Sequence, residues 1–275
     1  MVKAMAAPSM LDPWLERWSL APDGEAFETL GGWLLPVRSE SRPAMLKLAS
    51  NLEERRGGAL MAWWDGQGAV PVLALEGEAL LMARAQGSRC LAAMARDGHD
   101  DEATDILCAA AGRLHAAHDG DFPADLVALP DWFAALKSTA ARHGGVLARA
   151  YATSRALLND PYEVVVLHGD IHHANVLEFA DGDWLAIDPK ALIGERGFDY
   201  ANILCNPDPE IAATPGRLAR QAERIADAAG LELGRLAAWT LAYAGLSASW
   251  TLAAGGDPRP TLEIASAAAA LAPEL

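Results

Sequence analysis

The sequence is poor in cysteine, and its cysteines show no pairing motif. Among 275 residues there are three, at positions 90, 108 and 205, with no CxxC spacing. An odd number of widely separated cysteines argues against a disulfide framework and against a thiolate metal site. The pattern favours reduced thiols in a cytoplasmic protein.

Long apolar runs are also missing. Charged residues interrupt the most apolar segments every few positions, so no stretch of about 18 apolar residues is available to cross a membrane. The first 20 residues contain Pro8 and Pro13 and no continuous apolar core, which predicts mature protein rather than a signal peptide. We therefore expect no membrane span.

Basic residues are scarce: 22 Lys and Arg stand against 37 Asp and Glu, for a net charge of -15. This balance argues against a nucleic-acid partner held through its phosphates and suits a cationic partner. Eleven acidic and two basic residues lie between Asp160 and Glu210, so this segment has a net charge of -9. A solubilising acidic surface is the competing explanation.

The residues that are present predict a globular α+β protein with 52% hydrophobic and 21% charged residues. In residues 1–86 we predict a small sheet with one helix, from the strands "FETLGGWLLPVR", "PAMLKLAS", "AVPVLALEG" and "EALLMARA" and the helix "NLEERRGGALMAWW". Residues 87–275 predict a larger, mainly helical lobe with two short strands, "YEVVVLHGD" and "WLAIDP". In a late helix that Thr214 should cap, Arg217 and Arg220 are expected to be solvated.

The most polar short segment is "LHGDIHHAN", residues 167–175, which follows an apolar strand. His168 and His172 are four apart and would share one face of a helix. A strand ends just before them, however, and neither an HExxH helix nor thiolate partners are present. These features disfavour a zinc site.

A catalytic loop explains the segment better. Protein kinases use the spacing H-R-D-x-x-x-x-N, followed by a second metal-binding Asp at the end of the next strand. Here Asp170 precedes Asn175 at that spacing, and the strand predicted in "WLAIDP" ends at Asp188. Magnesium ions that bridge phosphates need oxygen ligands from two directions, and a further carboxylate must meet the acceptor hydroxyl. The pattern predicts phosphoryl transfer with ATP and Mg²⁺.

A phosphate-binding lysine is the other part that such a site requires. Lys47 stands alone on an apolar strand, where its charge needs a partner if it is buried. Glu53 lies on the predicted inward stripe of the following helix and is the preferred partner, with Glu54 as the alternative. Each of these features alone has an ordinary structural explanation, such as a turn, a helix cap or a snorkelling lysine. Together, in this order, they favour a kinase-like site.

Three motifs, "LHGDIHHANVL", "WLAIDPKALIGERGFDYANILCNP" and "WLLPVR", resemble those of the aminoglycoside phosphotransferases. They look most like the streptomycin 6-phosphotransferase and hydroxyurea-resistance kinase branch. The likeness is close from Tyr162 to Pro209 and weaker over the first lobe. It implies a bilobal protein-kinase-like fold, in which a small antiparallel sheet lobe with one helix is joined to a larger helical lobe.

The resemblance also implies roles for single residues. Asp170 would be the catalytic base, Asn175 and Asp188 the magnesium ligands, and Lys47 the phosphate-binding lysine. A hinge whose backbone pairs with the adenine of ATP would consist of Met82, Ala83, Arg84 and Ala85.

Further roles are implied around this site. Asp199 would brace the catalytic loop through backbone N–H groups. Lys190 would either contact the phosphates or pair with Glu195. Two carboxylates of the late helices are candidates for a cationic acceptor pocket, namely Asp257 and Glu263.

Three functions remain open from the sequence. The first is an aminoglycoside O-phosphotransferase, with streptomycin as the first substrate to test. The second is a kinase of another small hydroxylated molecule, such as a sugar, an amino alcohol or hydroxyurea. The third is a non-catalytic nucleotide-binding module, which is disfavoured because the lysine, the base and both metal ligands are present.

Overall fold

The computed structural model describes residues 9–116, 121–180 and 182–273. The chain divides into two compact units. Unit 1 consists of residues 1–88, 118–125 and 177–191, and unit 2 of residues 89–117, 126–176 and 192–275. The first segment of unit 1 ends at residue 88, and two later segments join it.

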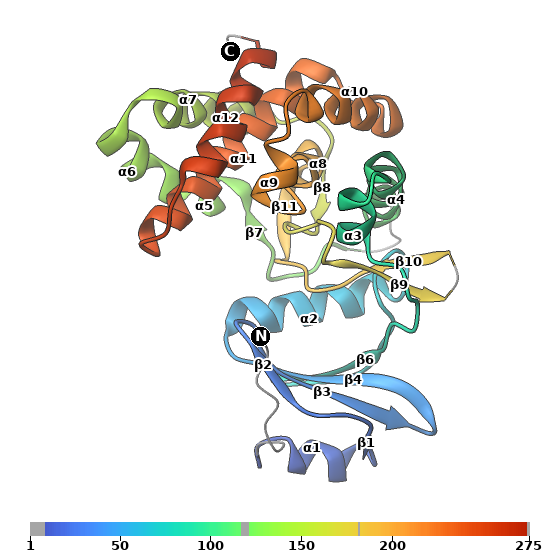
Figure 1. Ribbon diagram of the computed structural model, residues 1–275. Helices are drawn as coiled ribbons and strands as arrows, with labels where there is room; N and C mark the ends of the chain where they lie inside the picture. Colours follow the sequence, from blue (N-terminus) through green and yellow to red (C-terminus); the bar gives the residue numbers. More distant parts are fainter. Residues whose placement is uncertain (1–8, 117–120, 181, 274–275) are drawn as a thin grey trace. The chain divides into compact units, whose positions relative to one another are not determined.

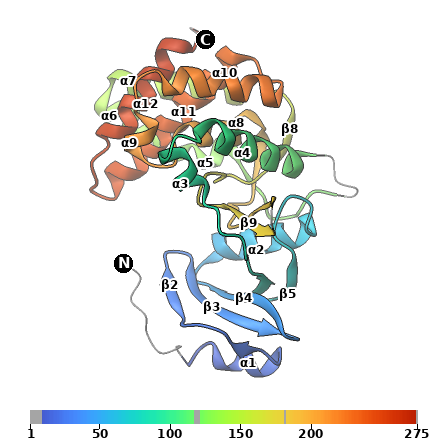
Figure 2. The same cartoon turned by 45° about the vertical axis from the view of Figure 1, so that its right-hand side comes forward.

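Unit 1 is built on an antiparallel sheet. Its strands run in the order β1-β3-β4-β6-β5, with β2 paired to β3. They are β1 (Ala21–Pro22), β2 (Phe27–Thr29), β3 (Gly32–Ser39), β4 (Arg42–Ala49), β5 (Val72–Glu76) and β6 (Ala79–Ala83). The helices α1 (Asp12–Arg17) and α2 (Leu52–Trp64) lie on opposite faces of this sheet (Figures 1 and 2).

The alternation of side chains in β4 decides which residue faces which helix. Leu46 and Leu48 belong to an apolar core that Trp14 of α1 packs against. Because successive side chains of a strand point to opposite faces, Lys47 points to the face that α2 covers. Asn51 begins α2 by accepting a hydrogen bond from the Glu54 N–H at 3.1 Å, which fixes the rotation of the helix about its axis.

A hairpin completes unit 1. It consists of β9 (Val176–Ala180) and β10 (Asp183–Ala186), and Ala186 also bridges to Ala69. The sequence predicted β10 but not β9. The reason is that Glu178, in the middle of β9, is buried at 4% exposure, so the strand lacks the usual pattern of apolar residues inside and polar residues outside.

Unit 2 is mainly helical, as predicted. Its helices are α3 (Leu91–Arg96), α4 (Asp100–His115), α5 (Leu129–Trp132), α6 (Ala134–His143), α7 (Gly145–Asn159), α8 (Gly197–Leu204), α9 (Pro209–Ala212), α10 (Arg217–Ala229), α11 (Leu233–Ala253) and α12 (Arg259–Leu271). A small sheet has the order β7-β11-β8, from β7 (Val127–Ala128), β8 (Val164–Leu167) and β11 (Leu192–Glu195). The sequence predicted β8 but neither β7 nor β11, which are too short for a periodic signal.

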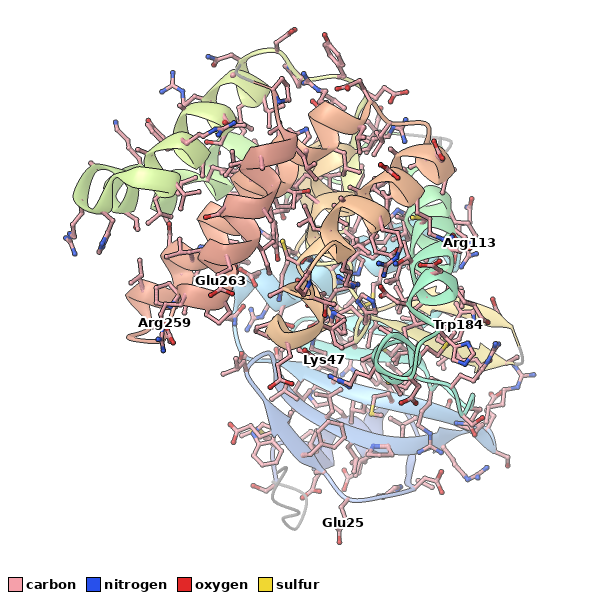
Figure 3. The ribbon with its side chains drawn as sticks, turned by 45° about the horizontal axis from the view of Figure 1, so that its top comes forward. Glu25, Lys47, Arg113, Trp184, Arg259 and Glu263 are labelled. Carbon is pink, nitrogen blue, oxygen red and sulfur yellow. The ribbon has the colours of Figure 1, made fainter. Side chains whose placement is uncertain are left out.

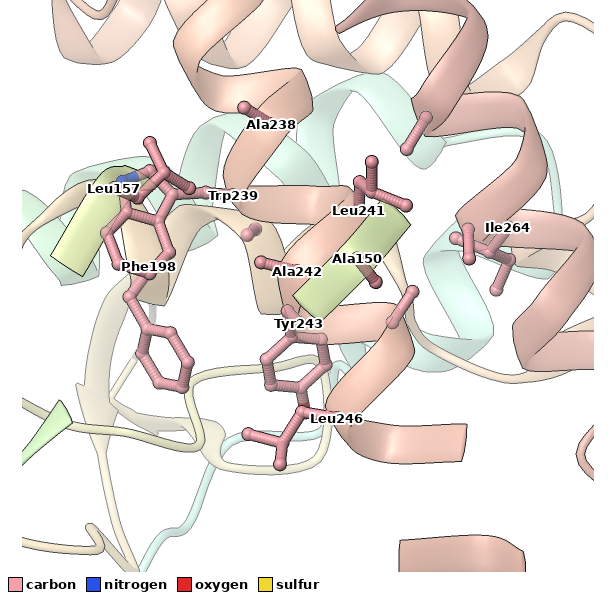
Figure 4. Close-up of a cluster of buried hydrophobic side chains, with 14 of the residues drawn as sticks. Ala150, Leu157, Phe198, Ala238, Trp239, Leu241, Ala242, Tyr243, Leu246 and Ile264 are labelled. Atoms are coloured by element: carbon pink, nitrogen blue, oxygen red, sulfur yellow. The ribbon is translucent and has the colours of Figure 1, made fainter. Parts of the chain in front are cut away.

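Helix α11 is the centre of unit 2. Thirteen of its 21 residues are buried, and it packs against α7, α8 and α12. Phe198 of α8 meets Trp239 and Tyr243 of α11 edge-on in the apolar core (Figure 4). A helix that is apolar on nearly every side is buried in the middle of its domain. Even so, none of the helices in the described ranges is both long and apolar enough to cross a bilayer.

One expectation about the late helices is wrong. Arg217 is 2% exposed, and its Nε and Nη2 atoms lie 2.9 and 2.8 Å from the carboxylate of Asp100 in α4. Helix α10 begins at Arg217, three residues beyond the predicted cap at Thr214. Arg220 is solvated as expected, with a side chain 56% exposed. Arg217 is buried because it has a carboxylate partner from a distant part of the sequence.

Candidate active site

In unit 1, Lys47 is held between two carboxylates. Its Nζ atom lies 2.5 Å from Glu54 Oε2 and 2.5 Å from Asp188 Oδ1. Lys47 is 6% exposed and stands on β4, where Figure 3 labels it. The structure therefore brings the predicted lysine together with the predicted metal ligand Asp188, and both partners compensate a charge that is costly to bury.

The prediction that Glu53 is the partner of Lys47 is wrong. The Glu53 side chain is 43% exposed and pairs with Lys190 at 3.1 Å, whereas the Glu54 side chain is 5% exposed and binds Lys47. One residue corresponds to a rotation of about 100° around a helix. The Asn51 cap sets that rotation so that Glu54 faces Lys47 of the sheet and is buried.

Two glycines allow the close approaches around Glu54. A Cβ atom at Gly31, in the turn between β2 and β3, would lie 2.6 Å from Glu54 Oε2. A Cβ atom at Gly57 would lie 2.3 Å from the carbonyl oxygen of Pro189. Gly57 thus allows the backbone next to Asp188 to lie directly on α2.

Lys190, for which two partners were open, binds α2. Its Nζ atom lies 3.1 Å from Glu53 Oε1 and 3.3 Å from Glu54 Oε1. The other candidate partner, Glu195, binds Arg235 in unit 2 at 2.6 Å. The Glu54 carboxylate therefore bridges two ammonium groups, one on each of its oxygen atoms.

The neighbouring opposite charges keep Asp188 and Lys190 ionised. Burial acts to raise the pKa of Asp188, but the ammonium groups of Lys47 and Lys190 outweigh it and hold that pKa below its usual value. Burial acts to lower the pKa of Lys190, but the carboxylates of Asp188, Glu54 and Glu53 outweigh it and raise that pKa. Asp188 is thus a carboxylate at neutral pH, with 35% of its side chain exposed.

The predicted hinge lies at the end of β6 and just beyond it. Within it, the Ala83 N–H donates to Pro71 O at 3.0 Å and the Arg84 N–H donates to Pro43 O at 3.4 Å. The Arg84 guanidinium binds Asp23 at 2.5 Å. These two N–H groups are engaged within unit 1, so pairing with adenine would have to use other backbone groups of residues 82–85.

In unit 2, Asp199 holds the loop that contains Asp170. Its Oδ2 atom accepts a hydrogen bond from the His168 N–H at 2.9 Å, and its Oδ1 atom accepts one from the Gly169 N–H at 2.8 Å. His115 Nε2 lies 2.8 Å from the same carboxylate. This is the bracing arrangement that the sequence predicted, and Asp199 is fully buried.

Two side-chain amides donate hydrogen bonds to Asp170. Asn175 Nδ2 donates to Asp170 O at 2.9 Å and to Asp170 Oδ2 at 3.3 Å. Asn202 Nδ2 donates to Asp170 Oδ1 at 3.1 Å. The structure therefore brings the two predicted residues of the loop together and adds Asn202, which the sequence analysis missed. The Asp170 side chain remains 30% exposed, as a group that meets a substrate must be.

The available donor atoms suit magnesium. Because Asn175 turns its NH₂ group to Asp170, its amide oxygen is the atom that could bind a cation. Asp188 offers an ionised carboxylate. Within the described part of the chain, no group of three or more His, Cys, Asp or Glu side chains could hold a metal ion. Each unit thus offers one oxygen donor of the kind that Mg²⁺ binds, and Mg²⁺ needs few protein ligands because it completes its coordination with water and substrate phosphates.

The acidic segment 160–210 is partly neutralised from elsewhere in the chain. In unit 2, Glu195 binds Arg235 and Asp208 binds Arg96, each at 2.6 Å. These pairs reduce the charge that the segment could offer to a cationic ligand.

The two carboxylates proposed for the acceptor pocket lie at the start of α12. Asp257 forms an exposed pair with Arg259 at 2.6 Å. Glu263 follows Arg259 one turn later on α12 and is also exposed (Figure 3). Of the two, Asp257 already has its cationic partner.

The chain is similar to several known proteins along most of its length. The model of the aminoglycoside/hydroxyurea antibiotic resistance kinase family matches residues 17–255. The streptomycin 3''-kinase of Klebsiella pneumoniae is 49% identical over 246 residues, which cover 88% of this chain and 92% of that protein. The streptomycin 6-kinase of Streptomyces griseus is 31% identical over 90% of this chain and 84% of its own.

A solved structure extends the likeness to the fold. An aminoglycoside phosphotransferase from Streptomyces rimosus, in complex with ADP and streptomycin, matches with a TM-score of 0.59 and 18% identity over 87% of this chain and 96% of that one. The likeness confirms the predicted α+β, protein-kinase-like fold.

Proposed function

Because the chain belongs to the aminoglycoside/hydroxyurea antibiotic resistance kinase family, we propose that it transfers the γ-phosphate of ATP to the 3''-hydroxyl of streptomycin. The observation that supports this acceptor is the 49% identity to a streptomycin 3''-kinase over nearly the whole of both chains. Identity to a streptomycin 6-kinase is lower, at 31%. A cytoplasmic location is part of the proposal, because ATP is the co-substrate.

The residues of unit 1 bind the nucleotide in this proposal. Lys47, held between Glu54 and Asp188, presents its ammonium group to the phosphates of ATP. Asp188 and Asn175 would hold Mg²⁺, which would supply positive charge against the charge that develops on the phosphoryl oxygens. The backbone of residues 82–85 pairs with adenine.

Asp170 orients the acceptor hydroxyl and accepts its proton. The carboxylate is held by the amides of Asn175 and Asn202, so its plane has a defined direction. Holding the hydroxyl in line with the phosphorus atom is the main contribution that a protein makes to phosphoryl transfer.

A second candidate acceptor follows from the relatives. The family description includes hydroxyurea, and the Streptomyces griseus relative is a streptomycin 6-kinase. The alternative within the same chemistry is therefore phosphorylation of hydroxyurea, or of streptomycin at its 6-hydroxyl.

The test is a coupled assay of ADP release with Mg²⁺ and ATP against streptomycin, a kanamycin-type aminoglycoside and hydroxyurea. We expect turnover with streptomycin, and ³¹P–¹H NMR of the product should place the phosphate on the 3'' position. The variant Asp170→Asn should lose about 10³-fold in kcat, the range for a positioned acid–base group. A phosphate on the 6 position would replace the proposed acceptor with the alternative. No ADP release with any of these acceptors, by protein that still binds ATP, would favour a kinase of another small hydroxylated molecule.

A further inference from the structure

Helix α8 contacts the Asp170 loop with a second side chain besides Asp199. Asn202 is fully buried, and its Nδ2 atom donates to Asp170 Oδ1 at 3.1 Å. Asp199 and Asn202 are three residues apart and so lie on one face of the helix. One turn of α8 therefore holds both the backbone of the loop and the carboxylate of Asp170.

A third amide fixes the orientation of Asn202. Asn206, just beyond α8, directs its Nδ2 atom to Asn202 Oδ1 at 2.8 Å and to Asn202 O at 2.9 Å. The chain of hydrogen bonds thus runs from Asn206 through Asn202 to Asp170, and each link is within unit 2.

The donors and acceptors in this series of hydrogen bonds can be arranged in only one way. An ionised carboxylate accepts hydrogen bonds and cannot donate them, so Asn202 must turn its NH₂ group to Asp170. Its amide oxygen then faces Asn206, which supplies NH₂ protons to it. In the flipped orientation, an amide oxygen would face the carboxylate and two NH₂ groups would face each other. Asn206 therefore disfavours the rotamer of Asn202 that would repel Asp170.

The two oxygen atoms of Asp170 consequently have different partners. Asn175 contacts Oδ2 and Asn202 contacts Oδ1, and together they fix the plane of the carboxylate. Asn175 is also the proposed metal-binding residue, whereas Asn202 is a buried amide that donates to Oδ1, which His172 Nε2 approaches at 3.7 Å.

We infer that Asn202 is a positioning residue that fixes the direction of the Asp170 carboxylate, and that Asn206 acts on Asp170 only through Asn202. The inference rests on the proposed role of Asp170 as the group that orients the acceptor hydroxyl. It assigns a task in the reaction to Asn202 and Asn206, which contact neither nucleotide nor acceptor in the proposal.

The experiment compares the wild-type protein with Asn202→Leu, Asn206→Ala and the double variant. Leucine keeps the branched arrangement of heavy atoms of asparagine, with bulkier ends, and removes the donor. We expect kcat with streptomycin to fall on the order of 10–10²-fold in Asn202→Leu, the effect of misplacing a reacting group by about 1 Å. The KM for ATP should stay within about twofold of wild type, because Lys47 and Asp188 are unchanged.

Asn206→Ala distinguishes positioning from general stability. It should lower kcat about fivefold in the wild-type background and leave kcat unchanged in the Asn202→Leu background, because the two residues form one chain. Full additivity of the two losses would overturn the serial arrangement. If Asn202→Leu fails to fold, Asn206→Ala alone decides, since Asn206 is only partly buried; an unchanged kcat in that variant would reject the inference.

Thr240→Val serves as the matched control. Thr240 is a fully buried polar residue of α11 whose hydroxyl binds Leu236 O at 2.8 Å. We expect Thr240→Val to lower Tm while kcat stays at the wild-type value. A kcat in Asn202→Leu within twofold of wild type would also reject the inference.

The failure of this inference can be told apart from a failure of the proposed function. If wild-type protein does not act on streptomycin, the proposed acceptor is wrong. The same variants are then compared in ATP hydrolysis with water as the acceptor, where the same order of rates is expected. An unchanged rate of hydrolysis in Asn202→Leu would overturn the positioning role.

Discussion

The neighbouring glutamates of α2 allow a sharp test of the site in unit 1. Glu54→Gln keeps the shape of the side chain and removes the charge that bridges Lys47 and Lys190. Removing one partner of a buried pair destabilises a protein by about 3–5 kcal/mol. Asp188, which lies 2.5 Å from Lys47, still pairs with it in the variant. We therefore expect a smaller loss of stability, of about 2–3 kcal/mol.

Glu53→Gln is the matched control one residue earlier. The Glu53 side chain is 43% exposed, and exposed ion pairs contribute about 0–1 kcal/mol. At about 2–4 °C per kcal/mol for a chain of this size, thermal unfolding should show a Tm about 4–12 °C lower for Glu54→Gln and at most about 4 °C lower for Glu53→Gln.

Kinetics provide the second readout. Glu54→Gln should lower kcat/KM for ATP about tenfold or more, because Lys47 loses the carboxylate that places its ammonium group. Glu53→Gln should stay within about threefold of wild type, since it contacts Lys190 and not Lys47. Equal losses in the two variants, or a larger loss in Glu53→Gln, would refute the assignment of Glu54 as the partner of Lys47.

Two further predictions concern backbone approach and pH. Gly57→Ala should raise the KM for ATP and lower Tm, because the new Cβ atom would lie 2.3 Å from Pro189 O. The control Gly58→Ala should be neutral or stabilising, because the nearest atom to its Cβ would be 3.6 Å away. Equal effects of the two variants would contradict the close approach at Gly57. Burial, above all, lowers the pKa of His173 to about 3, so between about pH 6.5 and pH 3 the unfolded chain binds a proton that the folded chain does not, and stability falls as the pH falls. The loss is about 2 kcal/mol at pH 5, and urea midpoints at pH 7.5 and 5 should differ less in His173→Leu than in wild type.

The local parts of the site followed directly from the sequence. The strand containing Lys47 alternates over "AMLKLA", so one charged residue had to lie on the face opposite to Leu46 and Leu48. The segment around Asp170 has a fixed spacing over eight residues. Both features depend on the geometry of one element or one loop, and periodicity determines that geometry.

The choice between Glu53 and Glu54 marks the limit of such reasoning. Both residues precede an apolar stripe, and a shift of one residue rotates the helix by about 100°. The signal that could have decided it was the cap. Asn51 is a strong helix N-cap residue, and with the cap at Asn51 the third helical residue is Glu54, whose N–H the cap accepts.

Arg217 and Asn202 show what a single sequence could not provide. Arg217 binds Asp100, which lies 117 residues away in the sequence, and Asn202 binds Asp170, which lies 32 residues away. Neither periodicity nor spacing identifies which of many carboxylates a distant polar residue will meet, because that depends on how helices pack. A buried polar residue nevertheless needs a partner, so an Asn at a position that the helical pattern of "GFDYANIL" predicts to be buried already implies one. For Asn202 the implied partner is the carboxylate whose direction the proposed reaction depends on.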